Sequence, residues 1–191
     1  MSKGKLFLIL LFAGGALRAS GQGLRIQFND PHIRYSGRVA FTDTSAGLSW
    51  TATSLRINFS GTGVKALLAD ERGDNYYNVI IDGTVIRILH PDSTKQLYTL
   101  AAGLPNRKHS LELFKRTEWA MGKTEFYYFL LDRHATELPA PATPKRKMEV
   151  FGNSITCGYA VEDSTGQDRG TAPYENGYIS YAAILARHYD A

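Results

Sequence analysis

The chain has 191 residues, of which 43% are hydrophobic and 21% are charged. These proportions are typical of a folded globular protein and exclude a largely disordered one. The formal net charge is +4 and there is one cysteine, so an intramolecular disulfide is excluded and stability must come from a buried core.

Residues 1–21 are predicted to be a secretory signal peptide. A basic start with Lys3 and Lys5 precedes an apolar run at residues 6–12, and the run is shorter than the roughly 20 residues of a membrane-spanning helix. Cleavage after Gly21 would remove three basic residues and no acidic one. We therefore expect a secreted or periplasmic protein without a membrane partner after cleavage. Because its charge is then nearly balanced, we also expect no nucleic-acid partner.

Residues 22–132 are predicted to form a β-sandwich of the jelly-roll kind. Residues 55–60 alternate apolar and polar side chains and end at Gly61, which is the pattern of a half-buried strand. Further candidate strands lie at residues 24–28, 37–42, 64–69, 96–100, 110–116 and 125–131. Many short strands without a helical period indicate two packed sheets.

A β-hairpin is predicted at residues 76–89, whose sequence is YYNVIIDGTVIRIL. Two runs rich in β-branched and aromatic residues flank Asp82 and Gly83. This dipeptide favours the two-residue turn that joins antiparallel strands.

Residues 133–147 are predicted to be an extended linker. They contain three prolines, and Leu138 is their one long apolar side chain. Such a composition neither forms a core nor continues a strand or helix.

Residues 148–191 are predicted to be the start of an α/β domain. An apolar run at residues 148–151 indicates a strand, and apolar side chains at helical spacing indicate a helix at residues 178–185. One face of that helix holds Tyr178, Tyr181, Ala182 and Leu185. One strand and one helix cannot enclose a core. We therefore expect the domain to be truncated and the chain to be part of a longer protein.

The serine in the stretch GNSITC is the candidate nucleophile. Ser154 would follow a strand on a tight turn, which fixes its hydroxyl and directs backbone N–H groups at a reacting carbonyl. Gly152 would allow the turn, and the side chain of Asn153 could donate a hydrogen bond. The stretch is not the G-x-S-x-G elbow, because Thr156 occupies the place of the last glycine. The alternative is an ordinary turn.

Several separated stretches resemble carbohydrate esterase family 2. They are FGNSITCGYAVEDS and ENGYISYAAILAR in the second domain, and YYNVIIDG and LFKRTEW in the first. The resemblance implies a jelly roll followed by an SGNH (GDSL-type) hydrolase domain that removes O-acetyl groups from plant-wall polysaccharides such as xylan. It implies that Ser154 is the nucleophile and that its backbone N–H contributes to the oxyanion hole. It implies no cofactor.

Two departures from the family pattern concern the turn and the base. Asn153 stands where the commoner SGNH sequence has aspartate. The family's late Asp-x-x-His is not found, because none of the five histidines follows an aspartate by three positions. The family's other oxyanion donors are not found either. We therefore expect the base beyond Ala191 and expect these 191 residues alone to be inactive.

A different function class stays open, namely a carbohydrate-binding β-sandwich followed by an inactive hydrolase remnant. Its candidate sugar-stacking side chains are Trp50, Tyr76, Tyr77 and Trp119. Aromatic residues in a sandwich are more often part of the core.

Three other residues have competing interpretations. Cys157 is either a thiol nucleophile or, as we prefer, a small residue packed under the turn. Glu175 and Asn176 precede the predicted helix and are expected to cap it, although contact with substrate is an alternative. No metal site is expected, because no His, Cys or carboxylate pair has ligand spacing.

Overall fold

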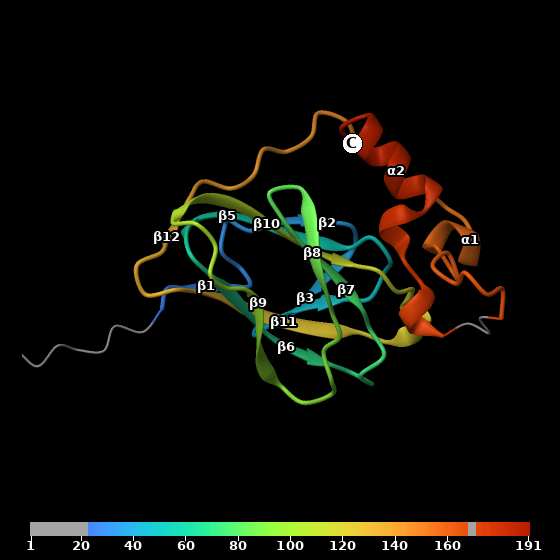
Figure 1. Ribbon diagram of the computed structural model, residues 1–191, viewed down its shortest axis with the longest axis horizontal. Helices are drawn as coiled ribbons and strands as arrows, with labels where there is room; N and C mark the ends of the chain where they lie inside the picture. Colours follow the sequence, from blue (N-terminus) through green and yellow to red (C-terminus); the bar gives the residue numbers. More distant parts are fainter. Residues whose placement is uncertain (1–22, 168–170) are drawn as a thin grey trace, which may run out of the picture.

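The computed structural model describes residues 23–167 and 171–191. The predicted signal peptide at residues 1–21 therefore lies outside the described residues. The described chain forms a β-sandwich, and its C-terminal segment packs at one end of the sandwich (Figure 1). None of the helices in this part of the chain is long and apolar enough to cross a membrane.

Two antiparallel six-stranded sheets form the predicted jelly-roll sandwich. The first has the order β3-β4-β11-β6-β9, with β1 also paired to β11. Its strands are β1 (Arg25–Gln27), β3 (Val39–Phe41), β4 (Ala46–Leu48), β6 (Val64–Asp70), β9 (Gln96–Ala101) and β11 (Thr124–Leu131).

The second sheet has the order β12-β5-β10-β7-β8, with β2 also paired to β5. Its strands are β2 (Arg34–Ser36), β5 (Ser54–Gly61), β7 (Tyr77–Ile81), β8 (Thr84–Leu89), β10 (Arg107–Lys115) and β12 (Thr136–Glu137). Strand β10 is central, since it pairs with β5 over residues 107–114 and with β7 over residues 111–115.

Alternating burial along the strands explains why the sheets face each other. Every second residue of β6 is buried, as the sequence pattern predicts. Leu68 of β6 and Ile57 and Phe59 of β5 are fully buried in one shared core. Because side chains alternate between the faces of a strand, one apolar face of each sheet is removed from water.

The predicted hairpin is confirmed. Strands β7 and β8 pair in antiparallel register around the turn. Asp82 has φ 51° and Gly83 has φ 80°, so both turn residues adopt the left-handed conformation that the two-residue turn requires.

Part of the predicted linker belongs to the sandwich. Thr136 and Glu137 form β12 on the edge of the second sheet, where they pair with β5. The N–H of Leu138 donates a hydrogen bond to the carbonyl of Asn58 at 3.0 Å. A strand of two residues carries too little periodicity to be found from sequence.

The predicted strand at residues 148–151 is wrong. These residues form neither helix nor strand, and Phe151 is 80% exposed. A strand needs a hydrogen-bonded neighbour, and none of the strands in the described chain pairs with this run.

The C-terminal segment is built from short helices. They are α1 (Ser154–Cys157), the 3-10 helices η2 (Ala172–Tyr174) and η3 (Gly177–Ile179), and α2 (Tyr181–His188). Helix α2 begins at Tyr181, later than predicted, and extends to His188. Of the predicted face, Tyr178 packs against Phe114, whereas Tyr181 and Leu185 are exposed and the buried residue of α2 is Ala183.

Candidate functional site

Ser154 is the first residue of α1, a single helical turn that follows Gly152 and Asn153. Asn153 is the N-cap, and its side-chain oxygen accepts a hydrogen bond from the N–H of Ile155 at 3.1 Å. Its amide N–H groups are separate from this oxygen, so the expectation that the side chain donates stays a prediction. As an N-cap it fixes the start of the helix and hence the position of Ser154.

Gly152 is required by the packing of this turn. A Cβ at this position would lie 1.9 Å from the Thr156 hydroxyl oxygen. That hydroxyl makes a 2.8 Å hydrogen bond with the Tyr181 hydroxyl. Thr156, which replaces the last glycine of the common elbow, thus connects α1 to α2.

The side chain of Ser154 is exposed. Its carbonyl accepts a hydrogen bond from the N–H of Tyr159 at 2.9 Å, while its own N–H donates no backbone hydrogen bond among the described residues. The hydroxyl and the N–H are therefore both available to a substrate carbonyl.

Ser154 has no histidine partner among residues 23–167 and 171–191. The most suggestive histidine, His109, is buried and lies 2.8 Å from the Asp82 carboxylate. However, His109 is near the start of β10, whereas the serine turn is held at Arg116, just past the end of that strand. Seven residues of strand separate these points by about 23 Å, so His109 cannot serve Ser154.

Arg116 fastens the C-terminal segment to the sandwich. Its side chain is fully buried and donates hydrogen bonds to the carbonyls of Glu175 and Pro173, both at 3.2 Å, and to the Glu162 carboxylate. Sequence reasoning missed Arg116. The signal that could have found it is a basic residue directly after the apolar strand β10.

The backbone of Gly177 completes this contact. Its N–H donates to the carbonyl of Arg116 at 2.9 Å. A Cβ on Gly177 would lie 2.2 Å from the Thr51 methyl carbon, so only glycine allows this close approach.

Asn176 connects the contact to the serine turn. Its N–H donates to the carbonyl of Gly158, the residue that ends α1, at 3.0 Å. Its side chain accepts from Asn78 of β7 at 3.3 Å and donates to Glu162 at 2.7 Å. The expected capping role is confirmed for Asn176, which caps η3 through the N–H of Tyr178.

Glu175 does not cap the start of a helix as expected; it is the C-cap of η2, and its N–H donates to the carbonyl of Ala172. It is 1% exposed, and neither carboxylate oxygen makes a hydrogen bond of normal geometry within the described chain. Burial, with Glu118 nearby, raises the pKa of Glu175 to about 7. Burial also lowers the pKa of the neighbouring Lys115 to about 8. The sandwich and the C-terminal segment thus enclose two strongly perturbed charges.

Cys157 lies half-buried beside these groups. Burial raises its pKa, which disfavours the thiolate that nucleophilic attack requires. The structure thus favours the packing role over the thiol-nucleophile alternative.

Two clusters bring potential metal-ligand atoms within 4.8 Å of one another. One contains Glu118, Cys157 and Glu175; the other contains Asp30, His32 and Glu137. Sequence spacing could not reveal either, because each joins residues far apart in the chain. In the second cluster Asp30 and His32 already form a hydrogen bond of 2.9 Å.

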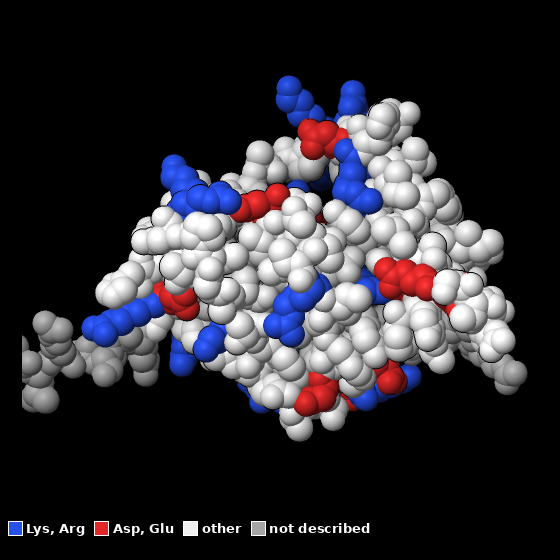
Figure 2. Space-filling view, in the orientation of Figure 1, with Lys and Arg blue, Asp and Glu red and all other residues white. Residues whose placement is uncertain are grey.

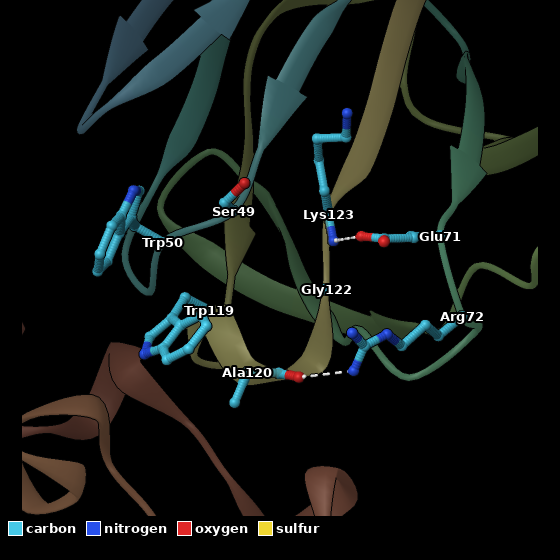
Figure 3. Close-up of a pocket in the computed structure, with 8 residues that line it drawn as sticks. All are labelled: Ser49, Trp50, Glu71, Arg72, Trp119, Ala120, Gly122 and Lys123. Atoms are coloured by element: carbon cyan, nitrogen blue, oxygen red, sulfur yellow. Dashed lines mark hydrogen bonds between the residues drawn. The ribbon is translucent and has the colours of Figure 1, made fainter.

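The four aromatic candidates for sugar stacking separate into two groups. Tyr77 is fully buried in the core, and Tyr76 stacks on His90 with ring centroids 4.1 Å apart. Trp50 and Trp119 instead line one surface pocket with Ser49, Glu71, Arg72, Ala120, Gly122 and Lys123 (Figure 3).

Charged side chains of both signs are interspersed on the face of the molecule in Figure 2. Lys and Arg do not cover this face as one continuous patch. A mixed surface of this kind provides little of the phosphate attraction that dominates nucleic-acid binding.

Comparison with known proteins gives esterases from sequence and carbohydrate esterases from structure. A family model described as "Carbohydrate esterase 2 N-terminal" matches residues 35–141. Among curated proteins, the chain is 34% identical over 164 residues to the cellulase/esterase CelE of Acetivibrio thermocellus, covering 85% of this chain and 20% of that protein. It is 30% identical over 168 residues to an acetylxylan esterase/glucomannan deacetylase of Cellvibrio japonicus, and the match covers 87% of this chain and 46% of that protein.

Solved structures agree. A family two carbohydrate esterase from Cellvibrio japonicus superimposes with a TM-score of 0.81 at 30% identity, over 88% of this chain and 50% of that chain. A family two carbohydrate esterase from Clostridium thermocellum, in complex with cellohexaose, superimposes with a TM-score of 0.78 at 34% identity. The match covers 82% of this chain and 48% of that chain. The chain thus spans half or less of the length of these relatives.

Proposed function

Because this chain belongs to carbohydrate esterase family 2, we propose that it supplies the nucleophile of a secreted SGNH-type serine esterase. The proposed substrate is plant-wall polysaccharide carrying O-acetyl groups, such as xylan. The observation that carries the proposal is the position of Ser154. It is exposed, it begins a helical turn capped by Asn153, and its N–H is available to a ligand.

The proposed reaction is acyl transfer through the Ser154 hydroxyl. The oxygen attacks the acetyl carbonyl while a base removes its proton, and the N–H of Ser154 donates to the resulting oxyanion. The carbohydrate hydroxyl then leaves with a proton, and water hydrolyses the acetyl-enzyme. Since Ser154 has no histidine partner in the described residues, the base is proposed to come from outside them, as the family resemblance implies.

Secretion is part of the proposal and is supported by the signal-peptide pattern of residues 1–21. A plant polysaccharide is too large to enter a cell, so its esterase must be exported. N-terminal sequencing of the mature protein tests this, with a start at Gln22 or nearby as the expected result.

A second candidate is the sugar-binding sandwich with an inactive hydrolase remnant, since no histidine contacts Ser154 among residues 23–167 and 171–191. Acetate release from acetylated xylan by the full-length protein distinguishes the two. We expect Ser154→Ala to abolish it and Ser164→Ala, the same change at an exposed serine ten positions along the chain, to leave it unchanged. Normal acetate release by the Ser154→Ala protein would overturn the proposal.

A further inference from the structure

Two exposed tryptophans line the same surface pocket on the sandwich. Trp50 follows β4 and is 47% exposed, and Trp119 begins η1 (Trp119–Met121) and is 61% exposed. The pocket has a volume of about 370 Å³, at the small end of the range for small-molecule sites. Figure 3 shows both indole rings on one side of it, opposite Glu71, Arg72 and Lys123.

The backbone of the loop that carries Trp119 is held in place by hydrogen bonds. The loop that carries Trp119 is closed by two hydrogen bonds between Glu71 and Lys123: the N–H of Glu71 donates to the Lys123 carbonyl at 2.8 Å, and the N–H of Lys123 donates to the Glu71 carboxylate at 3.0 Å. Gly122, which ends η1, has φ 88°. A fixed loop loses little conformational entropy when a ligand binds.

The rest of the pocket is polar and carries both signs of charge. Arg72 donates to the carbonyl of Ala120 at 3.2 Å and thereby lies along the pocket wall (Figure 3). Lys123 pairs with Glu125 at 2.7 Å. The hydroxyl of Ser49 and the carboxylate of Glu71 add hydrogen-bond acceptors. The lining therefore offers donors and acceptors without selecting one sign of charge.

We propose that the pocket between Trp50 and Trp119 binds an uncharged oligosaccharide. A pyranose ring has an apolar C–H face, which a flat indole can cover, and an edge of hydroxyl groups that both donate and accept hydrogen bonds. The Arg38 guanidinium lies 5.9 Å from the centroid of the Trp50 ring. Within the described residues Trp119 makes no aromatic or cation–π contact, so the surface of its ring remains for a ligand. Aromatic side chains supply large contact areas in such sites.

The pocket lies beside the segment that carries Ser154. Trp50 is followed by Thr51, and a Cβ on Gly177 would touch both Thr51 and the carbonyl of Cys157, at 2.2 and 3.3 Å. Trp119 is preceded by Glu118, whose carboxylate shares a cluster with Cys157. Cys157 ends the helical turn that Ser154 begins. Resting here on the proposed esterase function, we take the ligand to be the main chain of the acetylated glycan, held while an acetyl group reaches Ser154.

Tryptophan fluorescence tests the pocket directly, because Trp50 and Trp119 are the two tryptophans of the chain. The purified chain is titrated with xylohexaose and with cellohexaose, neither of which carries acetyl groups, and calorimetry gives the affinity. We expect a saturable change in fluorescence. We expect Trp119→Ala to weaken binding about tenfold or more, whereas Phe41→Ala, which removes an aromatic ring of similar exposure (57%) outside the pocket, leaves it unchanged.

Each other outcome has a defined meaning. Absence of binding by both methods, or equal affinity for wild type and the Trp119→Ala variant, overturns the proposal. If Trp119→Ala does not fold, Trp119→Phe keeps a stacking ring and must retain most of the affinity. If Trp119→Ala lowers the melting temperature of the full-length protein but leaves sugar binding intact, the tryptophan contacts another part of that protein and the proposal fails. Sugar binding by the chain, with no acetate release by the full-length protein, would refute the esterase function and still support the sugar-binding pocket.

Discussion

The sandwich and the C-terminal segment are stabilised in different ways. The two sheets enclose a continuous core in which residues such as Leu113 and Phe129 are fully buried. In the C-terminal segment Phe151 is 80% and Ile155 70% exposed, and the buried apolar residues are the small Ala172 and Ala183. The sandwich carries its own core, whereas the segment with the candidate nucleophile depends on the surface against which it packs.

The contact combines buried polar groups with a small apolar cluster that includes Ile80, Phe114 and Ala183. Arg116 and Gly177 join the two parts through backbone carbonyls and N–H groups. Tyr178 adds an edge-on ring contact with Phe114, with centroids 5.1 Å apart. The end of β10 is therefore the support on which the serine turn is built.

The largest expected effect compares one phenylalanine from each region. Phe129→Ala should lower the free energy of unfolding by about 3–5 kcal/mol, because it leaves a cavity in the sandwich core. Phe151→Ala in the same chain should change it by less than about 0.5 kcal/mol, because the ring is exposed. Chemical denaturation measures both. Equal losses would mean that the two regions share one core.

The next effect concerns the contact between Arg116 and the C-terminal segment. Arg116→Ala should cost about 3 kcal/mol, because it leaves buried carbonyls and the Glu162 carboxylate without their donor. Hydrogen exchange measured by mass spectrometry should rise across residues 158–179 and stay low in β5. The control is Arg38→Ala, which removes an exposed ion pair with Glu149 and should cost less than about 1 kcal/mol. Unchanged exchange in residues 158–179 would show that Arg116 does not hold the segment.

A smaller effect should follow pH through Glu175. Its pKa is about 7 in the folded chain, against an ordinary value of 4.5 for a solvated glutamate. Between these pH values the unfolded chain releases a proton that the folded chain keeps. The free energy of unfolding therefore falls as the pH rises. We expect a total decrease of about 2 kcal/mol after allowing for local relaxation. Lys115, with a pKa of about 8, stays charged over this range.

Melting temperatures from pH 4.5 to 7 test this expectation. Glu175→Gln cannot ionise and should lose the decline between these pH values, whereas Glu149→Gln, at an exposed carboxylate, should keep it. A Glu175→Gln protein with the same pH dependence as wild type would contradict a raised pKa for Glu175.

The two regions also differ in how far their sequence predicts them. Strands such as β5 and β6 follow from period-two alternation, and the β7–β8 turn follows from Asp82-Gly83, because these signals are local. The apolar run at residues 148–151 is equally local, yet it forms no strand, since a strand also needs a partner. The roles of Arg116 and Glu175 depend on contacts between distant segments, which a single sequence does not reveal.

The position of Ser154 follows from a local sequence pattern, but the contacts that hold it do not. Gly152 and Asn153 are local requirements of the turn and are identified with it. Thr156, which departs from the common elbow, bonds Tyr181. That contact requires α2 to pack against α1, although Thr156 and Tyr181 are 25 residues apart in the chain. No short sequence motif encodes such a contact.

Covalent labelling of the full-length protein tests the central claim most directly, namely that Ser154 is a nucleophile held on the sandwich. Diethyl p-nitrophenyl phosphate reacts with activated serines, and mass spectrometry of the digested protein locates the adduct. The account predicts one diethylphosphoryl group on Ser154, formed in step with the loss of acetate release and absent from the Ser154→Ala protein. Complete inactivation with the adduct on another residue, or acetate release that persists when Ser154 is labelled, would contradict it.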